Sequence, residues 1–237
     1  MTMKTAVITG AGSGLGRAIA LHLAQAGYHV VLVSKTESKL IKVAEEIKAM
    51  GGSSDVEAFD ITETAKVKAL AHKLADTSLD VLVNCAGDWL IKTIDETTDA
   101  DLDHILSVNL KAPYLLSRDL LPSLRKSDNA SIINIGSIAA ENYFGGITAY
   151  TVAKTGLKAL SGSLADELRP ELIRVVMLSP SPMNTPMRWD ASPDIDPKML
   201  VEPETVAEVI SMLINLPKGI TIDNLLLQSM LLDLSDD

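Results

Sequence analysis

Short apolar runs alternate along the chain with longer stretches in which apolar residues recur at helical spacing. The short runs predict buried strands, and the periodic stretches predict amphipathic helices that cover them. The expected strands are residues 5–9, 29–33, 56–59, 79–83, 131–135, 174–178 and 220–227. The expected helices are residues 37–50, 99–125, 150–168 and 203–216, with a further helix directly after residue 16. This alternation predicts one α/β domain over residues 1–237 with a buried parallel sheet.

Two stretches interrupt the pattern. Residues 183–200 are rich in Pro, Asp and Met without a clear period, and they predict a mobile substrate lid with little secondary structure of its own. Pro113 lies inside the helical pattern of residues 99–125. Because proline has no N–H, the carbonyl of Asn109 loses its helical donor. We therefore predict that this carbonyl has no helical partner and holds an ordered water.

Composition and charge restrict the class of ligand. Aromatic residues make up only 3%, so the core must consist of Ala, Val, Ile and Leu. The 31 acidic residues outnumber 21 basic ones, the formal net charge is −10, and no basic run occurs. This composition argues against nucleic acid and favours a small-molecule ligand.

The remaining composition argues against a disulfide, a metal site and a membrane span. Cys85 is the only cysteine, so no intrachain disulfide forms. The four histidines are scattered without paired spacing, which predicts no metal site. No apolar run approaches the length of a membrane span and the first residues contain no basic leader, so we expect a cytoplasmic protein.

A glycine-rich turn, residues 10–16, joins the first strand to the helix that follows. Glycines are needed where a chain turns sharply and where backbone N–H groups approach a pyrophosphate at a helix N-terminus. The second strand ends in Ser34-Lys35-Thr36. A carboxylate there would bind the ribose hydroxyls of NAD, whereas a cation and two hydroxyls favour NADP(H) over NAD(H). Lys35 as an ordinary solvated residue is the alternative.

Two later positions fit the same nucleotide site. Asp60 follows the third strand, where it can be a helix N-cap, an acceptor for an adenine amino group, or both. The fourth strand leads into Asn84-Cys85-Ala86-Gly87, whose small residues let the backbone pass close to a flat ligand.

Tyr150 and Lys154 lie one helical turn apart. An ammonium beside a phenol stabilises the phenolate and lowers its pKa, so the pair can form a proton donor. A solvated helix face carries the same spacing, and only the surrounding sequence distinguishes the two interpretations.

The ordered set of these motifs resembles the short-chain dehydrogenase/reductase family over nearly the whole chain. Its carriers are Thr9-Gly10-x-x-x-Gly14-x-Gly16, Asp60, Asn84-Cys85-Ala86-Gly87, Asn109, Ser137, Tyr150-x-x-x-Lys154, and Pro180 with Thr185. The resemblance implies a Rossmann-like, doubly wound sheet of seven parallel strands with helices on both faces. It also implies hydride transfer between a nicotinamide and a carbonyl or alcohol.

The resemblance assigns roles to four catalytic residues. Tyr150 would exchange the proton with the substrate oxygen, and Ser137 would hydrogen-bond that oxygen. Lys154 would lower the pKa of Tyr150 and bind the nicotinamide ribose, and Asn109 would hold a water that links Lys154 to solvent.

The expected cofactor residues are Thr9, Gly10, Ser13, Gly14, Leu15, Gly16, Ser34, Lys35, Thr36, Asp60, Ile61, Asn84, Ala86, Gly87, Tyr150, Lys154, Pro180, Met183 and Thr185. The expected substrate residues are Ser137, Trp89, Tyr143, Phe144 and Met187. The family usually has Pro-Gly after the sixth strand, and Pro180-Ser181-Pro182 here is stiffer.

We expect an NADPH-dependent reductase of a moderately apolar ketone, and two alternatives stay open. A 3-oxoacyl-carrier-protein reductase is disfavoured by Glu171, where the family often has Arg, and by the negative net charge. A catalytically idle dinucleotide sensor would have no need of Ser137, Tyr150 and Lys154 together. We also expect a homo-oligomer, dimer or tetramer, formed through apolar helix faces carrying Leu115, Leu116, Leu120, Leu157, Leu160 and Leu164.

Overall fold

The computed structural model describes residues 3–191 and 194–231. Seven parallel strands form one sheet in the order β3-β2-β1-β4-β5-β6-β7. The strands are β1 (Thr5–Thr9), β2 (His29–Ser34), β3 (Ser53–Ala58), β4 (Val81–Asn84), β5 (Ser131–Ile135), β6 (Arg174–Pro180) and β7 (Asn224–Leu227). The predicted Rossmann-like, doubly wound sheet is confirmed.

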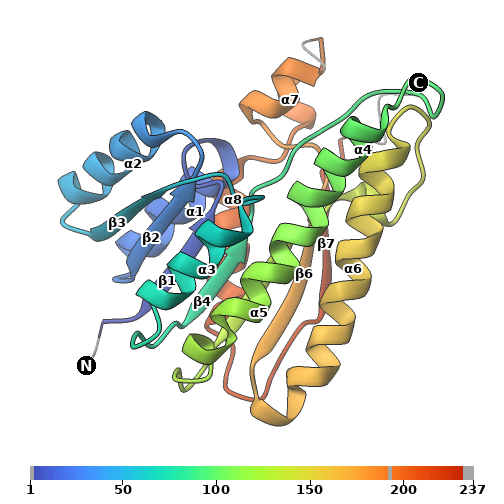
Figure 1. Ribbon diagram of the computed structural model, residues 1–237. Helices are drawn as coiled ribbons and strands as arrows, with labels where there is room; N and C mark the ends of the chain where they lie inside the picture. The colour runs from blue at the N-terminus through green and yellow to red at the C-terminus, as the bar shows by residue number, and fades with distance from the viewer. Residues whose placement is uncertain (1–2, 192–193, 232–237) are drawn as a thin grey trace.

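Two helical layers cover the sheet because successive strand residues point to opposite faces. Ile8 packs in the core under α1 (Gly14–Gln25), α2 (Glu37–Ala49) and α8 (Pro203–Ile214). Its neighbour Val7 packs in the other core, under α3 (Thr64–Lys73), α5 (Ala112–Leu124) and α6 (Thr148–Leu168). Figure 1 shows α3, α5 and α6 in front of the strands and α8 behind them.

The two outer strands differ most from the predicted ranges. β3 begins at Ser53, three residues before the predicted start, and β7 begins only at Asn224. Both lie at the edges of the sheet, and neither contains a fully buried side chain: β3 is mostly partly buried, and β7 alternates exposed and partly buried residues. An edge strand does not need a continuous apolar run, so the apolar pattern does not mark its ends.

The predicted helix over residues 99–125 is not continuous. α4 (Asp99–Leu106) runs into a π-helical turn, Ser107–Lys111, before α5 begins at Ala112. Pro113 lies in the first turn of α5, where its missing N–H costs least. Asn109 lies within the π-helical turn and is fully buried. That its carbonyl lacks a helical donor stays a prediction.

The predicted lid has more secondary structure than expected. Its described part contains α7 (Pro186–Ala191) and a 3₁₀-helix, Pro197–Met199, and Met183 pairs with Val201 in a β-bridge. Residues 192–193 of the predicted lid lie outside the described residues. Thr185 accepts backbone hydrogen bonds from Arg188 and Trp189, which close the first turn of α7. Mobility of the segment stays a prediction.

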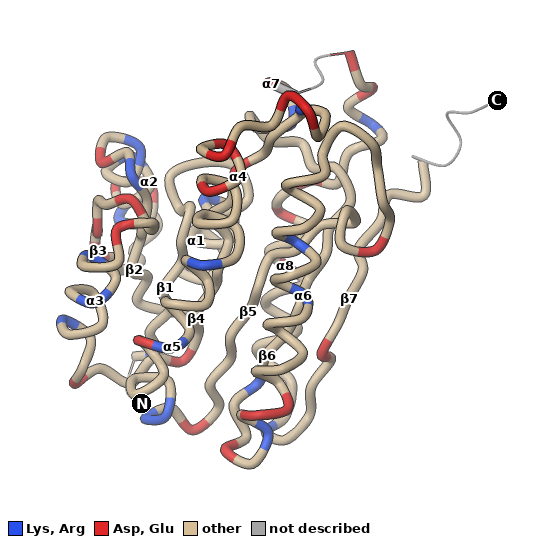
Figure 2. The backbone as a smooth tube through the Cα atoms, turned by 45° about the vertical axis from the view of Figure 1, so that its right-hand side comes forward, with Lys and Arg blue, Asp and Glu red and all other residues tan. Residues whose placement is uncertain are grey.

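The leucines expected to form oligomer contacts are largely used within the chain. Leu116 and Leu120 are fully buried, and Leu157 is almost so. They pack in the cores of the single chain, so they cannot contact a second subunit. Figure 2 shows basic and acidic residues interspersed along the helices rather than gathered into a basic face. In the described ranges, we find no helix long and apolar enough to cross a membrane.

Candidate active site

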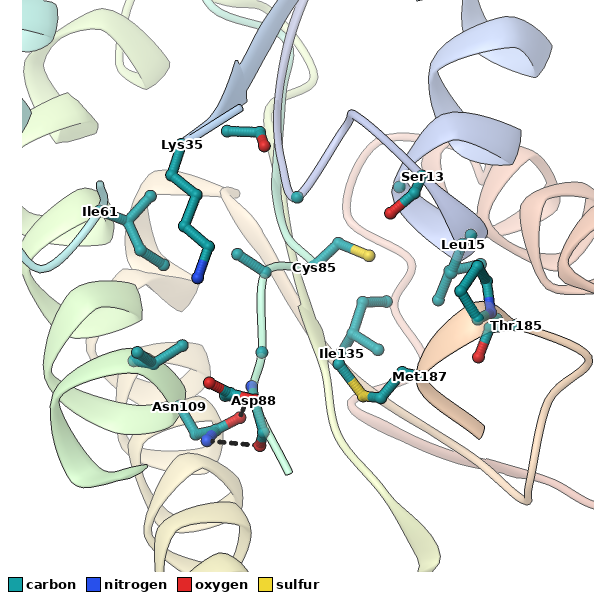
Figure 3. Close-up of a pocket in the computed structure, with 18 of the residues that line it drawn as sticks. Ser13, Leu15, Lys35, Ile61, Cys85, Asp88, Asn109, Ile135, Thr185 and Met187 are labelled. Atoms are coloured by element: carbon teal, nitrogen blue, oxygen red, sulfur yellow. Dashed lines mark hydrogen bonds between the residues drawn. The ribbon is translucent and has the colours of Figure 1, made fainter. Parts of the chain in front are cut away.

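The site lies at the carboxyl edge of the sheet, where the strand order reverses between β1 and β4. Ligands of doubly wound sheets bind at this switch point. A cavity of about 300 Å³ opens there between the loops that follow β1, β2, β3, β4 and β5. We call it the cofactor cleft, and Figure 3 shows Lys35, Cys85, Asn109 and Thr185 around it.

The glycine turn forms one wall of the cofactor cleft. A Cβ atom on Gly16 would lie 2.2 Å from the carbonyl oxygen of Gly10, so no larger residue fits where the turn meets α1. Ser13, the N-cap of α1, makes no side-chain capping bond. The first N–H groups of α1 are thus not capped by Ser13 and can bind an anion at the positive helix end. Gly10, Ser13, Gly14 and Leu15 line the cleft as predicted.

The end of β2 forms the second wall. Ser34, Lys35 and Thr36 line the cleft as predicted, and Lys39 on the first turn of α2 joins them. Figure 3 shows the Lys35 side chain extending into the cleft on the side of Ile61. The sequence analysis missed Lys39, although its place in the first turn of the predicted helix, four residues after Lys35, was a usable signal.

Asp60 lines the cleft with Ile61, as predicted. It is not a helix N-cap, because Glu63 holds that position on α3. The Asp60 carboxylate instead accepts from the backbone N–H of Thr62 at 2.9 Å and from its hydroxyl at 2.8 Å. The Thr62 N–H contributes most to lowering the pKa of Asp60, with smaller contributions from Lys35 and His104.

Two predicted cofactor residues lie beneath the cleft and not on its wall. The Thr9 hydroxyl accepts from the backbone N–H groups of Cys85 and Ala86, each at 3.0 Å. Asn84 is buried and donates to Asn134 at 2.8 Å. Thr9 therefore fixes the loop after β4, and Asn84 joins the end of β4 to β5. Ala86 and Gly87 of that loop line the cleft, and so does Cys85, whose thiol pKa burial raises to about 12.

Asn109, Gly87 and Lys154 meet behind this loop. The Asn109 side-chain nitrogen donates to the carbonyls of Asp88 at 3.0 Å and Ile105 at 3.1 Å. A Cβ on Gly87 would lie 2.9 Å from the Asn109 side-chain oxygen and 3.5 Å from the Lys154 Nζ. A glycine is therefore required for the loop to pass between these two side chains.

Tyr150 and Lys154 are not a solvated helix face. Only 8% of Tyr150 and 5% of Lys154 is exposed. The Lys154 ammonium donates to the carbonyl of Ile135 at 2.9 Å and lies 5.7 Å from the centre of the Tyr150 ring. Ser137 lies on the loop after β5, and its hydroxyl acts on the Tyr150 phenol to lower the phenol's pKa. Asn109, Tyr150 and Lys154 thus line the cofactor cleft, and Ser137 lies next to Tyr150.

The predicted downward shift of the Tyr150 pKa is wrong. Burial raises this pKa to about 12, and the hydrogen bond with Ser137 opposes the shift only in part. Burial also lowers the pKa of Lys154 to about 8. Lys154 is not among the causes of the Tyr150 shift, and its ammonium donates to the carbonyl of Ile135. The phenol is therefore protonated at neutral pH.

A second cavity, of about 550 Å³, lies on the other side of Tyr150, and we call it the substrate cavity. Ser137, Trp89, Phe144 and Met187 line it as predicted, and Pro180 lies here rather than in the cofactor cleft. Tyr143 is 80% exposed and does not line it, which corrects the prediction. The residues that line both cavities are Gly136, Tyr150, Met183, Thr185 and Met187.

Comparison with known proteins agrees with this geometry. Residues 4–196 match the family model described as short chain dehydrogenase. The chain belongs to the short-chain dehydrogenase family. It is 29% identical to a sepiapterin reductase of Chlorobaculum tepidum, with 98% of each chain covered. The family and enzyme class predicted from the motifs are confirmed.

Two solved structures have the same fold. A metagenomic short-chain oxidoreductase in complex with NADP superposes with a TM-score of 0.82 at 36% identity, covering 94% of this chain and 96% of the other. An alcohol dehydrogenase from Thermococcus sibiricus, complexed with 5-hydroxy-NADP, gives a TM-score of 0.89 at 26% identity, covering 97% of each chain.

Proposed function

We propose that this short-chain dehydrogenase reduces a ketone to an alcohol with NADPH. The observation that carries the proposal is the position of Tyr150, a buried phenol on the wall shared by the cofactor cleft and the substrate cavity. A phenol with a pKa raised to about 12 holds its proton at neutral pH and can act as a general acid. The phenol therefore carries the proton that reduction of a carbonyl requires.

The cofactor cleft fits a dinucleotide. The uncapped N-terminus of α1 and the glycine turn suit a pyrophosphate, and Asp60 suits the adenine. Lys35 and Lys39 place two cations where a 2′-phosphate would lie, which supports NADP(H) over NAD(H). The two solved relatives with NADP or its 5-hydroxy derivative support the same choice.

When bound, the cofactor supplies the hydride. The chain's own residues supply the proton and the geometry. Ser137 would orient the substrate oxygen, and Tyr150 would donate its proton to that oxygen. Lys154 would hold the nicotinamide ribose, and Asn109 would fix the loop containing Gly87 and Asp88 against the cleft.

Turnover is tested by following NADPH consumption with a panel of ketones that includes sepiapterin, because a relative carries that name. Tyr150→Phe should lower kcat by about a hundredfold or more, with the NADPH Kd unchanged. The matched control is Tyr143→Phe, which removes an exposed phenol outside both cavities. Full activity of Tyr150→Phe would contradict the proposal. Tight NADPH binding without turnover of any ketone by wild type would favour a dinucleotide sensor.

Cofactor choice is tested by measuring the Kd of NADPH and of NADH. Lys35→Ala combined with Lys39→Ala should weaken NADPH at least tenfold and leave NADH nearly unchanged, because only NADPH carries the 2′-phosphate. Lys42→Ala, an exposed lysine of the same helix that does not line the cleft, is the control. An equal loss for both cofactors would contradict the assignment.

A further inference from the structure

Among the described residues, one charged side chain lines the substrate cavity: Arg188 of α7. The rest of the wall is apolar or uncharged, with Ile138, Ile147 and Phe144 alongside polar residues such as Asn142 and Gln228. Arg188 is half-buried, and a single charged group on the wall of a largely apolar cavity suits recognition of a ligand of opposite charge.

No acid of the described chain neutralises Arg188. The described ion pairs do not include it, whereas Arg125 pairs with Glu171 and Arg118 with Asp119. The Nε of Arg188 is buried and has no hydrogen-bond partner in the described structure. Burial also lowers the pKa of Arg188, which is the direction expected for a cation without an anion nearby. Arg188 as a whole is half-buried, but a guanidinium N–H that is withdrawn from water normally has an acceptor, so we expect that acceptor from outside the chain.

Trp89 offers a second free donor in the same cavity. Its indole nitrogen is buried and has no partner among the described residues. The Trp89 ring lies edge-on to Tyr150, with the ring centres 4.5 Å apart. A buried indole N–H usually has an acceptor, so an oxygen-rich ligand beside Tyr150 would satisfy it.

We infer, on the basis of the proposed function, that the ketone substrate carries an anionic group, a carboxylate or a phosphate, which binds Arg188 while Ser137 and Tyr150 hold the carbonyl. A neutral ketone would leave the guanidinium unpaired. The net charge of −10 repels an anion from the protein as a whole, so a local cation is needed to hold one. The apolar wall between Arg188 and Tyr150 accommodates the body of the molecule.

The first test compares oxo acids with their methyl esters as substrates. The carboxylate series consists of straight-chain oxo acids in which the carbonyl and the carboxylate are increasingly far apart. Recognition of a phosphate is tested by comparing dihydroxyacetone phosphate with dihydroxyacetone. Wild type should prefer the anionic member of at least one pair in kcat/KM. Arg188→Ala should lower kcat/KM for that anion about ten- to a hundredfold, and leave the neutral member nearly unchanged. Arg188→Lys should restore part of the loss.

The matched control is Lys198→Ala, which removes one positive charge from an exposed site in the same segment, outside the cavity. It should leave the preference intact. The inference is overturned if wild type uses neutral ketones as well as every anionic partner, or if Arg188→Ala affects both members of a pair equally. If the oxo acids are preferred over their esters, the site binds a carboxylate; if dihydroxyacetone phosphate is preferred over dihydroxyacetone, it binds a phosphate.

A binding measurement separates failure of this inference from failure of the proposed function. Tyr150→Phe loaded with NADPH is titrated calorimetrically with the same acids and esters, so that no turnover is required. An anion should bind at least tenfold more tightly than its neutral partner, and adding Arg188→Ala should remove that difference. Selective binding without turnover in wild type would retain the anion site and refute the reductase. Equal binding of each pair would refute the anion site, whatever the activity.

Discussion

Replacing Lys154 with methionine is expected to stabilise the protein at neutral pH while removing its activity. Burial lowers the Lys154 pKa from 10.5 to about 8. At about 1.4 kcal/mol per pKa unit, holding this buried ammonium charged costs about 3 kcal/mol. Methionine has nearly the same length and no charge. It loses the hydrogen bond to the Ile135 carbonyl, which is worth about 1 kcal/mol, so the net gain is about 2 kcal/mol.

The sign of this effect reverses with pH. Between pH of about 8 and 10.5 the unfolded chain binds a proton at Lys154 more readily than the folded chain does. Wild-type stability therefore rises with pH across this window, and the penalty is gone above it. At about pH 10.5 and beyond, Lys154→Met should retain only the lost hydrogen bond and be less stable than wild type by about 1 kcal/mol.

Urea unfolding of both proteins at neutral pH and above pH 10.5 measures the two differences. Lys158→Met is the control on the same helix, because Lys158 is half-exposed and pairs with Glu141. Its effect should stay within about 1 kcal/mol of zero at neutral pH. A destabilised Lys154→Met at neutral pH, or the same difference at both pH values, would refute the burial penalty.

Two further substitutions test how the cleft is built. Thr9→Val removes the hydroxyl that accepts from Cys85 and Ala86, so urea unfolding should show a free energy of unfolding lower by about 2–4 kcal/mol. Thr9→Ser keeps the hydroxyl and should stay near wild type. A decrease below about 0.5 kcal/mol for Thr9→Val would contradict this role. Gly16→Ala should abolish NADPH binding or folding, because the new Cβ would lie 2.2 Å from the Gly10 carbonyl oxygen. The control, Gly162→Ala in α6, places its Cβ in open space and should leave stability unchanged or slightly raised. Calorimetric NADPH titration and thermal unfolding check both, and a wild-type Kd for Gly16→Ala would refute the close approach.

The order of the elements could be predicted because the central strands are buried on both faces. β1 and β6 consist of buried residues throughout, so both were located, although β6 extends two residues past its predicted end at Leu178. The outer strand β3 has no such requirement, and its start was misplaced. The π-helical turn at Ser107–Lys111 also escaped prediction. Pro113 indicated an irregularity in the helix. Its missing N–H does not show that the helix widens to a π-helical turn, or at which residues.

The candidate site divides in the same way. Residues that line the cofactor cleft through a fixed turn, such as Gly16 and Ser13, were predictable because local sequence determines that geometry. Arg188 was not, because its place on the cavity wall depends on α7, a short helix whose position comes from packing across the chain. Tyr143 was wrongly included for the converse reason: an aromatic residue beside Phe144 in sequence points to solvent.

Helical spacing predicts that Tyr150 and Lys154 are neighbours, but not which of two opposing effects sets their pKa values. Charge proximity favours the phenolate, and desolvation favours both neutral forms. Burial prevails here, since it raises the Tyr150 pKa to about 12 and lowers that of Lys154 to about 8. A site in this condition holds a proton on Tyr150 ready for a substrate oxygen. Desolvation also lowers the pKa of Arg188, and the same exclusion of water strengthens an ion pair between Arg188 and an anionic ketone.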